Sequence, residues 1–143
     1  MRVLVTGHKG YIGAVLMPML AAAGHEAVGV DSDLYERCTF GEALPATATM
    51  RKDIRDLEVA DLEGFDAVLH LAALSNDPLG NLNPNLTYDI NHRASVRLAR
   101  LAKAVGISRF LFSSSCSTYG AAGDEMLTEA ATFNPVTPYG HSK

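Results

Sequence analysis

The stretch Thr6-Gly7-His8-Lys9-Gly10-Tyr11-Ile12-Gly13 decides the fold of this 143-residue chain. It follows an apolar run at residues 2–6 and opens a second apolar segment at residues 11–23. That order predicts a buried strand followed by a helix. Glycines three residues apart at such a junction permit a tight turn, let an anion approach the backbone, and let the helix pack closely on the strand. Because the free N–H groups of the first helical turn face that anion, the stretch predicts a site for the pyrophosphate of a dinucleotide.

Asp31 strengthens this interpretation. It follows a second apolar run at residues 26–30 and comes 18 residues after Gly13, near the spacing of about 20 expected for the carboxylate that binds the adenosine ribose. A carboxylate accepts hydrogen bonds from ribose hydroxyls and repels a 2′-phosphate, which favours NAD over NADP. Arg37 would weaken that preference if the following loop folded back. His8 and Lys9 are expected in solvent, with Lys9 near a phosphate as the alternative. The competing interpretation is a plain tight turn followed by an exposed aspartate.

The rest of the chain alternates short strands with helices. Strands are predicted at residues 2–6, 26–30, 48–51, 66–71 and 109–113, and helical segments at 11–23, 54–61 and 86–105. Loops are predicted at 32–46, 72–85 and 114–138. This alternation predicts an α/β fold, a Rossmann-type doubly wound parallel sheet that stops after about five strands. The fifth strand is expected to be an open edge.

Composition excludes several classes of function. A net charge of −4 with 48% hydrophobic and 20% charged residues is that of an ordinary globular protein, without the basic surface that nucleic acid or an anionic membrane requires. Cys38 and Cys116 lack the spacing of a metal or disulfide site, so no metal is expected. The apolar segment at 11–23 is too short to span a bilayer, and no leader peptide is recognisable. These features predict a cytoplasmic protein.

Tyr139, Lys143 and Ser115 form a candidate catalytic group. Tyr139 and Lys143 are four residues apart and would share one face of a helix. A phenol has an ordinary pKa near 10, which a neighbouring ammonium lowers until the phenolate can act as a base. Ser115, just after the fifth predicted strand, could hydrogen-bond the substrate oxygen. Together they would oxidise a secondary alcohol to a ketone; the alternatives are a solvated helix face and serines that cap backbone groups.

The chain resembles a known family in several motifs taken together. They are TGHKGYIG at 6–13, Asp31, DIRD at 53–56, HLAA at 70–73, SSSCSTYG at 113–120 and YGHSK at 139–143. This combination is similar to the extended short-chain dehydrogenase/reductases, in the branch of NAD-dependent nucleotide-sugar epimerases and dehydratases. Its spacings agree with that branch: the glycines are three apart, and the tyrosine comes 24 residues after Ser115.

The resemblance implies a set of site residues. It assigns catalysis to Ser115, Tyr139 and Lys143, with Ser114 and Ser117 as competitors of Ser115. It implies an NAD site formed by Gly7, Gly10, Tyr11, Ile12, Gly13, Asp31, Asp53, Ile54, Leu71, Ala72, Ala73, Ser113, Tyr139 and Lys143. Within that set, Asp53 and Ile54 would flank the adenine, and Ala72 and Ala73 would lie beside the pyrophosphate and nicotinamide. Asn91 would lie near the active site or serve a structural hydrogen bond, and His70 is expected to be buried with its hydrogen bonds satisfied.

The resemblance also bears on the reaction. Related sugar dehydratases follow the catalytic hydroxyl with an Asp-Glu pair, and here Cys116 and Ser117 occupy those positions, which favours epimerisation of a nucleotide sugar. A non-catalytic NAD(H)-binding module and a dehydrogenase or reductase of a non-sugar alcohol or ketone are the alternatives. Because the family continues well past the Tyr/Lys motif, residues 1–143 are expected to be an incomplete NAD-binding domain, without the C-terminal substrate-binding portion and inactive alone. A homodimer is expected to be possible in the parent protein and doubtful for this chain.

Overall fold

The structure, a computed structural model, describes residues 1–38, 47–120 and 126–143. It divides into two compact units. We call Met1–Ala72 with Ser95–Ser113 the sheet unit, and Ala73–Ala94 with Ser114–Lys143 the helical unit.

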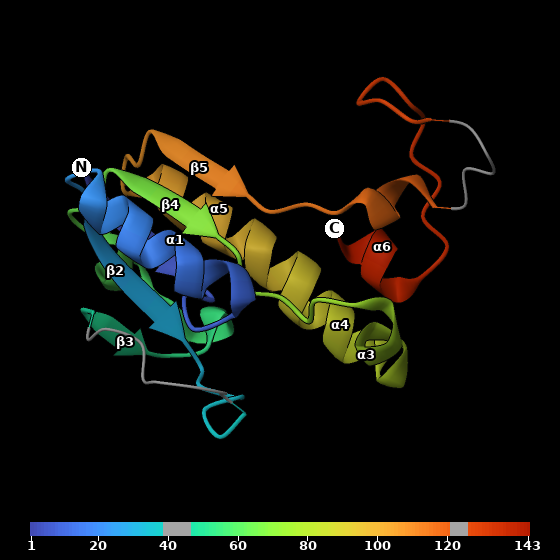
Figure 1. The fold of residues 1–143 in the computed structure, drawn as a ribbon, viewed down its shortest axis with the longest axis horizontal. Coiled ribbons are helices and arrows are strands. Elements are labelled where there is room, and N and C mark those ends of the chain that lie inside the picture. The colour runs from blue at the N-terminus through green and yellow to red at the C-terminus, as the bar shows by residue number, and fades with distance from the viewer. Residues whose placement is uncertain (39–46, 121–125) are drawn as a thin grey trace. The chain divides into compact units, whose positions relative to one another are not determined.

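The sheet unit contains five parallel strands (Figure 1). They are β1 (Arg2–Thr6), β2 (Glu26–Asp31), β3 (Thr49–Arg51), β4 (Ala67–His70) and β5 (Arg109–Phe112). Their order is β3-β2-β1-β4-β5, so the direction of winding reverses between β1 and β4. In sheets of this kind, ligands bind at the carboxyl ends of the strands at such a reversal. The predicted five-stranded Rossmann-type sheet is confirmed.

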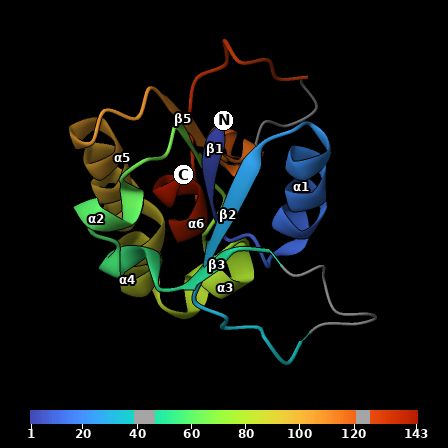
Figure 2. The same ribbon diagram turned by 90° about the vertical axis from the view of Figure 1, so that its left-hand side faces the viewer.

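Helices cover both faces of this sheet. Figure 2 shows α1 (Tyr11–Ala22) on one face, and α2 (Val59–Leu62) and α5 (Ala94–Ala104) on the other. Because side chains alternate along a strand, Val3 and Val5 form a core with Met17 of α1. The intervening Leu4 is fully buried on the opposite face. The predicted helical segment at 54–61 is interrupted, since a 3₁₀ turn, η1 (Ile54–Asp56), precedes α2.

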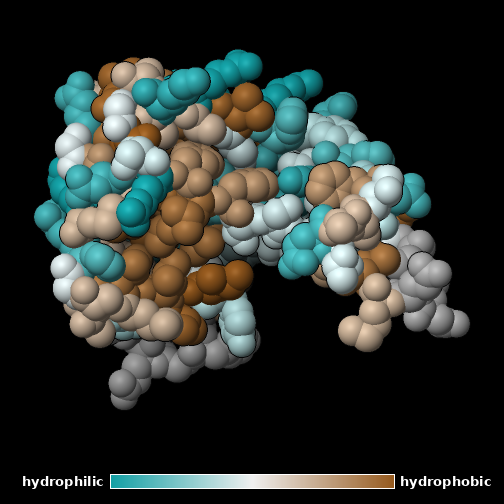
Figure 3. Space-filling view, turned by 90° about the horizontal axis from the view of Figure 1, so that it is seen from above, coloured by the Kyte–Doolittle hydropathy of each residue, from teal (hydrophilic) through white to brown (hydrophobic). Residues whose placement is uncertain are grey.

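β5 is an exposed edge, as the sequence predicts. Leu111 and Phe112 have exposed fractions of 52% and 38%, and Ile12, Val15 and Met19 of α1 are also exposed. Figure 3 shows hydrophobic residues gathered at the surface of the sheet unit.

Among the described residues, no helix combines the length and apolarity needed to cross a bilayer. Cys38 and Cys116 are exposed free thiols.

The helical unit corrects two expectations. The predicted loop at 72–85 contains α3 (Asp77–Leu82) and the start of α4 (Pro84–Thr87). Asn76 Oδ1 accepts the Leu79 N–H at 2.9 Å, and Asn83 Oδ1 accepts the Leu86 N–H at 3.1 Å, with a proline in the first turn of each helix. Asparagine and proline, typical of turns, are also typical of helix starts. The predicted helix at 86–105 is helical but contains a π-helical segment, η2 (Tyr88–Arg93), before α5.

The helical unit also holds η3 (Cys116–Tyr119), a 3₁₀ turn, and α6 (Pro138–Ser142). The Asn134 N–H donates to the Thr118 carbonyl at 3.0 Å, which joins Asn134 to η3. Gly120, with φ of +69°, lies so close to the Asn134 carbonyl oxygen that a Cβ there would overlap it.

Candidate functional site

The glycine turn lies against the end of β4. Gly7 has φ of +71°, which favours glycine, and a Cβ there would lie 2.8 Å from the Ala72 nitrogen. The Gly7 N–H donates to the Val30 carbonyl at 2.8 Å, and the Ala72 N–H donates to Thr6 Oγ1 at 3.2 Å. The turn is therefore fixed at the winding reversal between β1 and β4, with no room for a side chain.

The N-terminus of α1 fits an anion. Gly10 is its N-cap and supplies no side-chain oxygen to the first turn, so the leading N–H groups of Tyr11, Ile12 and Gly13 have no intrahelical acceptor. A Cβ at Gly13 would lie 2.5 Å from the His8 carbonyl oxygen, which shows how closely helix and turn approach. This arrangement fits the pyrophosphate of a dinucleotide.

Asp31 lies beside the same turn. Its Oδ2 accepts the Lys9 N–H at 3.1 Å, and its Oδ1 accepts the Asp33 N–H at 3.0 Å. Each carboxylate oxygen has further acceptor capacity, so Asp31 can also bind a pair of ribose hydroxyls. Arg37 is exposed. Two basic residues adjoin Asp31: Lys9, through its backbone N–H, and Arg51, which stands opposite Asp31 in the β2–β3 register.

The expectation that His8 is solvated is wrong. His8 is 3% exposed. Its ring lies over Gly29, where a Cβ would be 2.5 Å from Nδ1 and closer still to two other ring atoms, and its Nε2 lies 3.2 Å from Thr49 Oγ1. The missing side chain at Gly29 creates the space that the ring fills. Lys9 is exposed, as predicted, and its Nζ contacts the Asp33 carboxylate at 2.6 Å.

Asp53 and Ile54 follow β3 on the adjoining strand. Asp53 caps η1 by accepting the Arg55 N–H at 2.9 Å and pairs with the guanidinium, with Nη2 2.8 Å from Oδ2. The side-chain hydrogen bonds from Arg55 hold the pKa of Asp53 below its ordinary value, despite partial burial that acts to raise it. Ile54 is 6% exposed. Both residues lie one strand out from Asp31.

Leu71 and Ser113, two residues of the predicted NAD site, directly follow β4 and β5. The Leu71 N–H donates to the Thr6 carbonyl at 3.2 Å, and the Ser113 N–H donates to the His70 carbonyl at 3.1 Å. His70 is buried, with Nδ1 2.6 Å from Thr6 Oγ1 and Nε2 2.7 Å from Ser95 Oγ. This confirms the expectation of a satisfied, structural histidine. Ala73 belongs to the helical unit.

All three predicted catalytic residues belong to the helical unit. Ser115 caps η3, its Oγ accepting the Ser117 N–H at 3.2 Å. Tyr139 lies on α6 and is 9% exposed. α6 packs directly on η3, because a Cβ at Gly140 would lie 2.7 Å from the Ser117 carbonyl oxygen. The serine turn and the tyrosine helix are therefore neighbours.

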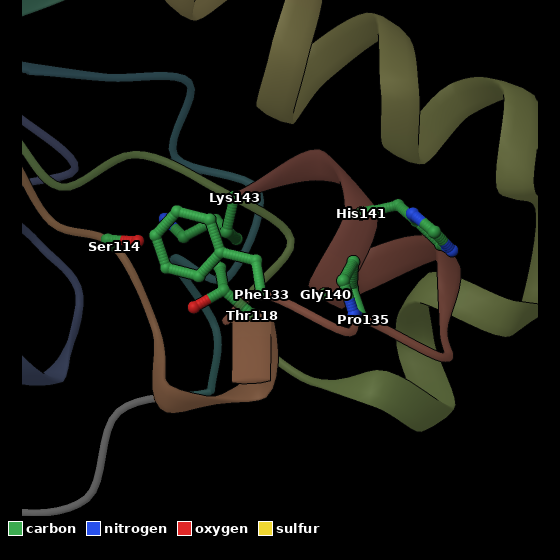
Figure 4. Close-up of a pocket in the computed structure, with 7 residues that line it drawn as sticks. All are labelled: Ser114, Thr118, Phe133, Pro135, Gly140, His141 and Lys143. Carbon is green, nitrogen blue, oxygen red and sulfur yellow. The ribbon is translucent and has the colours of Figure 1, made fainter. Parts of the chain in front are cut away.

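A pocket of about 180 Å³ lies beside this helix (Figure 4). Its lining residues are Ser114, Thr118, Phe133, Pro135, Gly140, His141 and Lys143. Burial lowers the pKa of the Lys143 ammonium. Ser114, rather than Ser115, lines this pocket, so the choice between the two serines stays open. In Figure 4 the His141 side chain extends away from the Phe133 ring.

Comparison with known proteins identifies the family. Residues 3–143 match the model of the NAD dependent epimerase/dehydratase family. The chain belongs to this family. A UDP-glucose 4-epimerase of Streptomyces lividans is 35% identical over 147 residues, which cover 98% of this chain and 44% of that protein. A UDP-glucose 4-epimerase of Klebsiella pneumoniae is 33% identical over 129 residues, covering 84% of this chain and 93% of that protein.

Solved structures of epimerases and dehydratases share the fold. The UDP-glucose-4-epimerase of Stenotrophomonas maltophila, with bound NAD and formylated UDP-arabinopyranose, matches with a TM-score of 0.87 and 34% identity, over 100% of this chain and 45% of that one. An NAD dependent NDP-hexosamine 5,6-dehydratase of tunicamycin biosynthesis matches with a TM-score of 0.88 and 29% identity, over 99% and 46%. The chain thus spans less than half the length of these two proteins and of the Streptomyces lividans epimerase.

In this member of the epimerase/dehydratase family, further residues hold the tyrosine helix in place. Asn91, in η2, is 1% exposed, and its Oδ1 accepts the Leu74 N–H at 2.8 Å. Its Nδ2 donates to the Leu74 carbonyl and to Ser142 Oγ, each at 3.0 Å. Thr137 Oγ1 accepts the Gly140 N–H at 3.0 Å and donates to the Asp77 carboxylate. The roles of Asp77, Thr137 and Ser142 are not predicted from the sequence. A threonine before proline is a helix-start signal that could have indicated Thr137.

Proposed function

We propose that this chain is the NAD-binding, N-terminal part of a nucleotide-sugar epimerase, which oxidises a sugar carbinol to a ketone and then reduces it again. The observation that carries the proposal is the cradle at the winding reversal. There Gly7 and Gly13 leave no space for side chains, and Asp31 is bonded to the turn itself. Support also comes from the UDP-glucose 4-epimerases among the relatives.

The positions of these residues support a set of proposed cofactor contacts. Gly7, Gly10, Gly13 and the first-turn amides of Tyr11 and Ile12 would hold the pyrophosphate, and Asp31 the adenosine ribose. Asp53 and Ile54 would flank the adenine. Leu71, Ala72, Ala73 and Ser113 would lie toward the nicotinamide. When bound, NAD⁺ supplies the hydride acceptor for the carbinol carbon and, once reduced, the donor for the ketone.

The chain's own side chains would handle the proton. Tyr139, as phenolate, would accept the carbinol proton, while the Ser115 hydroxyl donates a hydrogen bond to the same oxygen. Lys143 would stabilise the phenolate and bind the nicotinamide ribose. Because burial already disfavours its charge, a nearby phenolate would be a strong partner for it. Ser114 and Ser117 stay as alternatives to Ser115.

The residues after Ser115 favour epimerisation over dehydration. Elimination of water needs an acid and a base, and an exposed Cys116 followed by Ser117 does not provide them. The substrate is proposed to be a nucleotide sugar. It would be bound by a further part of the protein that corresponds to the additional length of the relatives. Residues 1–143 would then be an incomplete domain, with little turnover alone. Dimerisation in the parent protein and a cytoplasmic location stay predictions from the sequence.

Two measurements test the proposal. Calorimetry should show that the 143-residue chain binds NAD⁺ and NADH. In a longer protein that carries this chain, Tyr139→Phe should abolish UDP-sugar epimerisation while leaving NAD affinity unchanged, and Tyr35→Phe, at an exposed tyrosine, should change neither. A chain without NAD affinity would refute the proposal. NAD binding without sugar turnover in the longer protein would favour a binding module or a non-sugar reductase.

A further inference from the structure

A network of four charged groups surrounds the proposed ribose site. Asp31 is joined to Lys9 and Asp33 through their backbone N–H groups, at 3.1 and 3.0 Å. The Asp33 side chain is only 4% exposed and contacts the side chain of Lys9 in the glycine turn. Its Oδ1 lies 2.6 Å from Lys9 Nζ, and its Oδ2 lies 3.5 Å from Arg51 Nε. The Lys9 contact is close but is not aligned as a hydrogen bond.

Two of these groups are cations that could serve a phosphate. Lys9 belongs to the glycine turn, and Arg51 stands opposite Asp31 on the neighbouring strand. Their side chains are 40% and 65% exposed, so both can be reached from solvent. Without Asp33, these two positive side chains would be available to attract a phosphate on the ribose. Asp33 opposes that attraction, because its nearly buried carboxylate contacts both cations.

We propose that Asp33 makes this chain select NAD over NADP, by holding Lys9 and Arg51 in ion pairs that a 2′-phosphate would otherwise occupy. The inference rests on the proposed function and adds a second specificity residue to it. Asp31 would bind the ribose hydroxyls, and Asp33 would keep the two cations from accepting the extra phosphate. Glu36, 3.3 Å from Arg51 Nη2 and more exposed, adds to the same effect.

The test compares the affinities of NAD⁺ and NADP⁺ by calorimetry on the 143-residue chain and its variants. Asp33→Asn removes the charge while preserving the shape. Because each freed cation can then bond a phosphate oxygen, NADP⁺ should bind about tenfold more tightly or better, with NAD⁺ affinity changed less than about threefold. Since the gain is electrostatic, it should shrink as salt is raised. Adding both Lys9→Gln and Arg51→Gln to Asp33→Asn should reverse most of it.

Two further variants keep the test decisive. Asp33→Gly removes the same charge at a backbone with φ of +58°, which glycine adopts readily, so it gives the same answer if the asparagine variant folds poorly. Glu26→Gln removes one negative charge at the opposite end of β2, where Glu26 pairs with Arg2 at 3.1 Å, and should leave both affinities unchanged.

The outcomes separate this inference from the proposed function. If the unmodified chain binds neither dinucleotide, the proposed function fails and this inference fails with it. If the chain binds NAD⁺ and both Asp33 variants keep its original ratio of affinities, Asp33 does not set the preference and only this inference is overturned. A gain in NADP⁺ affinity that survives the combined loss of both cations, Lys9→Gln with Arg51→Gln, would also overturn it, because neither proposed cation would then be used.

Discussion

Replacing Gly29 by alanine tests whether the packing of the His8 ring on Gly29 supports the glycine turn. Gly29 lies in β2 under the His8 ring, where an added Cβ would be 2.5 Å from Nδ1 and closer to two more ring atoms. The ring has little freedom to retreat, because His8 is 3% exposed and its Nε2 lies 3.2 Å from Thr49 Oγ1. The substitution should therefore move His8 and the turn that carries it.

The magnitude follows from two opposing effects. Overpacking of a close-packed site costs about 1–3 kcal/mol. Gly→Ala in an accessible conformation returns about 0.4–1 kcal/mol by restricting the unfolded chain. Gly29→Ala should thus lower the free energy of unfolding by about 1–2 kcal/mol. In a His8→Ala background the overlap is absent, so the same change should stabilise by about 0.4–1 kcal/mol.

Urea unfolding followed by circular dichroism would measure all four members of this double-mutant cycle. A reversal of sign between the two backgrounds is the expected result. Equal effects of Gly29→Ala in both backgrounds, within about 0.5 kcal/mol, would refute the reasoning, because independent sites show that additivity. Such a result would mean that His8 does not fill the space above Gly29.

Three other substitutions test the cofactor cradle, an acid-sensitive contact and the support of the tyrosine helix. Gly7→Ala should reduce NAD affinity at least about tenfold in calorimetry, because the turn needs φ of +71° and has no room for a Cβ; an unchanged affinity would contradict the cradle. Hydrogen bonds from Arg55 lower the pKa of Asp53. The ionised carboxylate therefore contributes at most about 1 kcal/mol to the free energy of unfolding, and this contribution is complete above about pH 4 and lost as the pH falls below it. In urea titrations, Asp53→Asn should therefore reduce the fall in the free energy of unfolding between about pH 4 and 2. An unchanged dependence of that free energy on pH would disprove the linkage. Asn91→Ala should cost about 2–3 kcal/mol of unfolding free energy by leaving buried polar groups unpaired, and a thermal melt that hardly shifts would count against that role.

The sequence was sufficient for the sheet because each strand carries its own local signal. Apolar runs bounded by glycine and polar residues mark β1, β2 and β4, and the position of Asp31 after β2 follows from the same pattern. His70 was predicted correctly as a satisfied core residue because a polar ring within a buried strand needs hydrogen-bond partners.

Residues whose environment depends on distant partners were not predictable in this way. His8 is buried only because Gly29, 21 residues later, has no side chain. The ion pairs of Asp33 with Lys9 and Arg51 join three separate segments without a local pattern. α3 was predicted as a loop because its asparagine and proline start helices as well as turns, and only the capping bonds distinguish the two. The choice between Ser114 and Ser115 depends on side-chain direction, which adjacent serines do not reveal.

The hydrogen bond between the Asn134 N–H and the Thr118 carbonyl has a consequence for insertions into this chain. Because the bond holds these two residues together, each doubling of the length of chain between them should cost only about 0.6 kcal/mol of closure entropy. Extra residues inserted there should therefore leave Asn134 joined to η3 at little cost in stability.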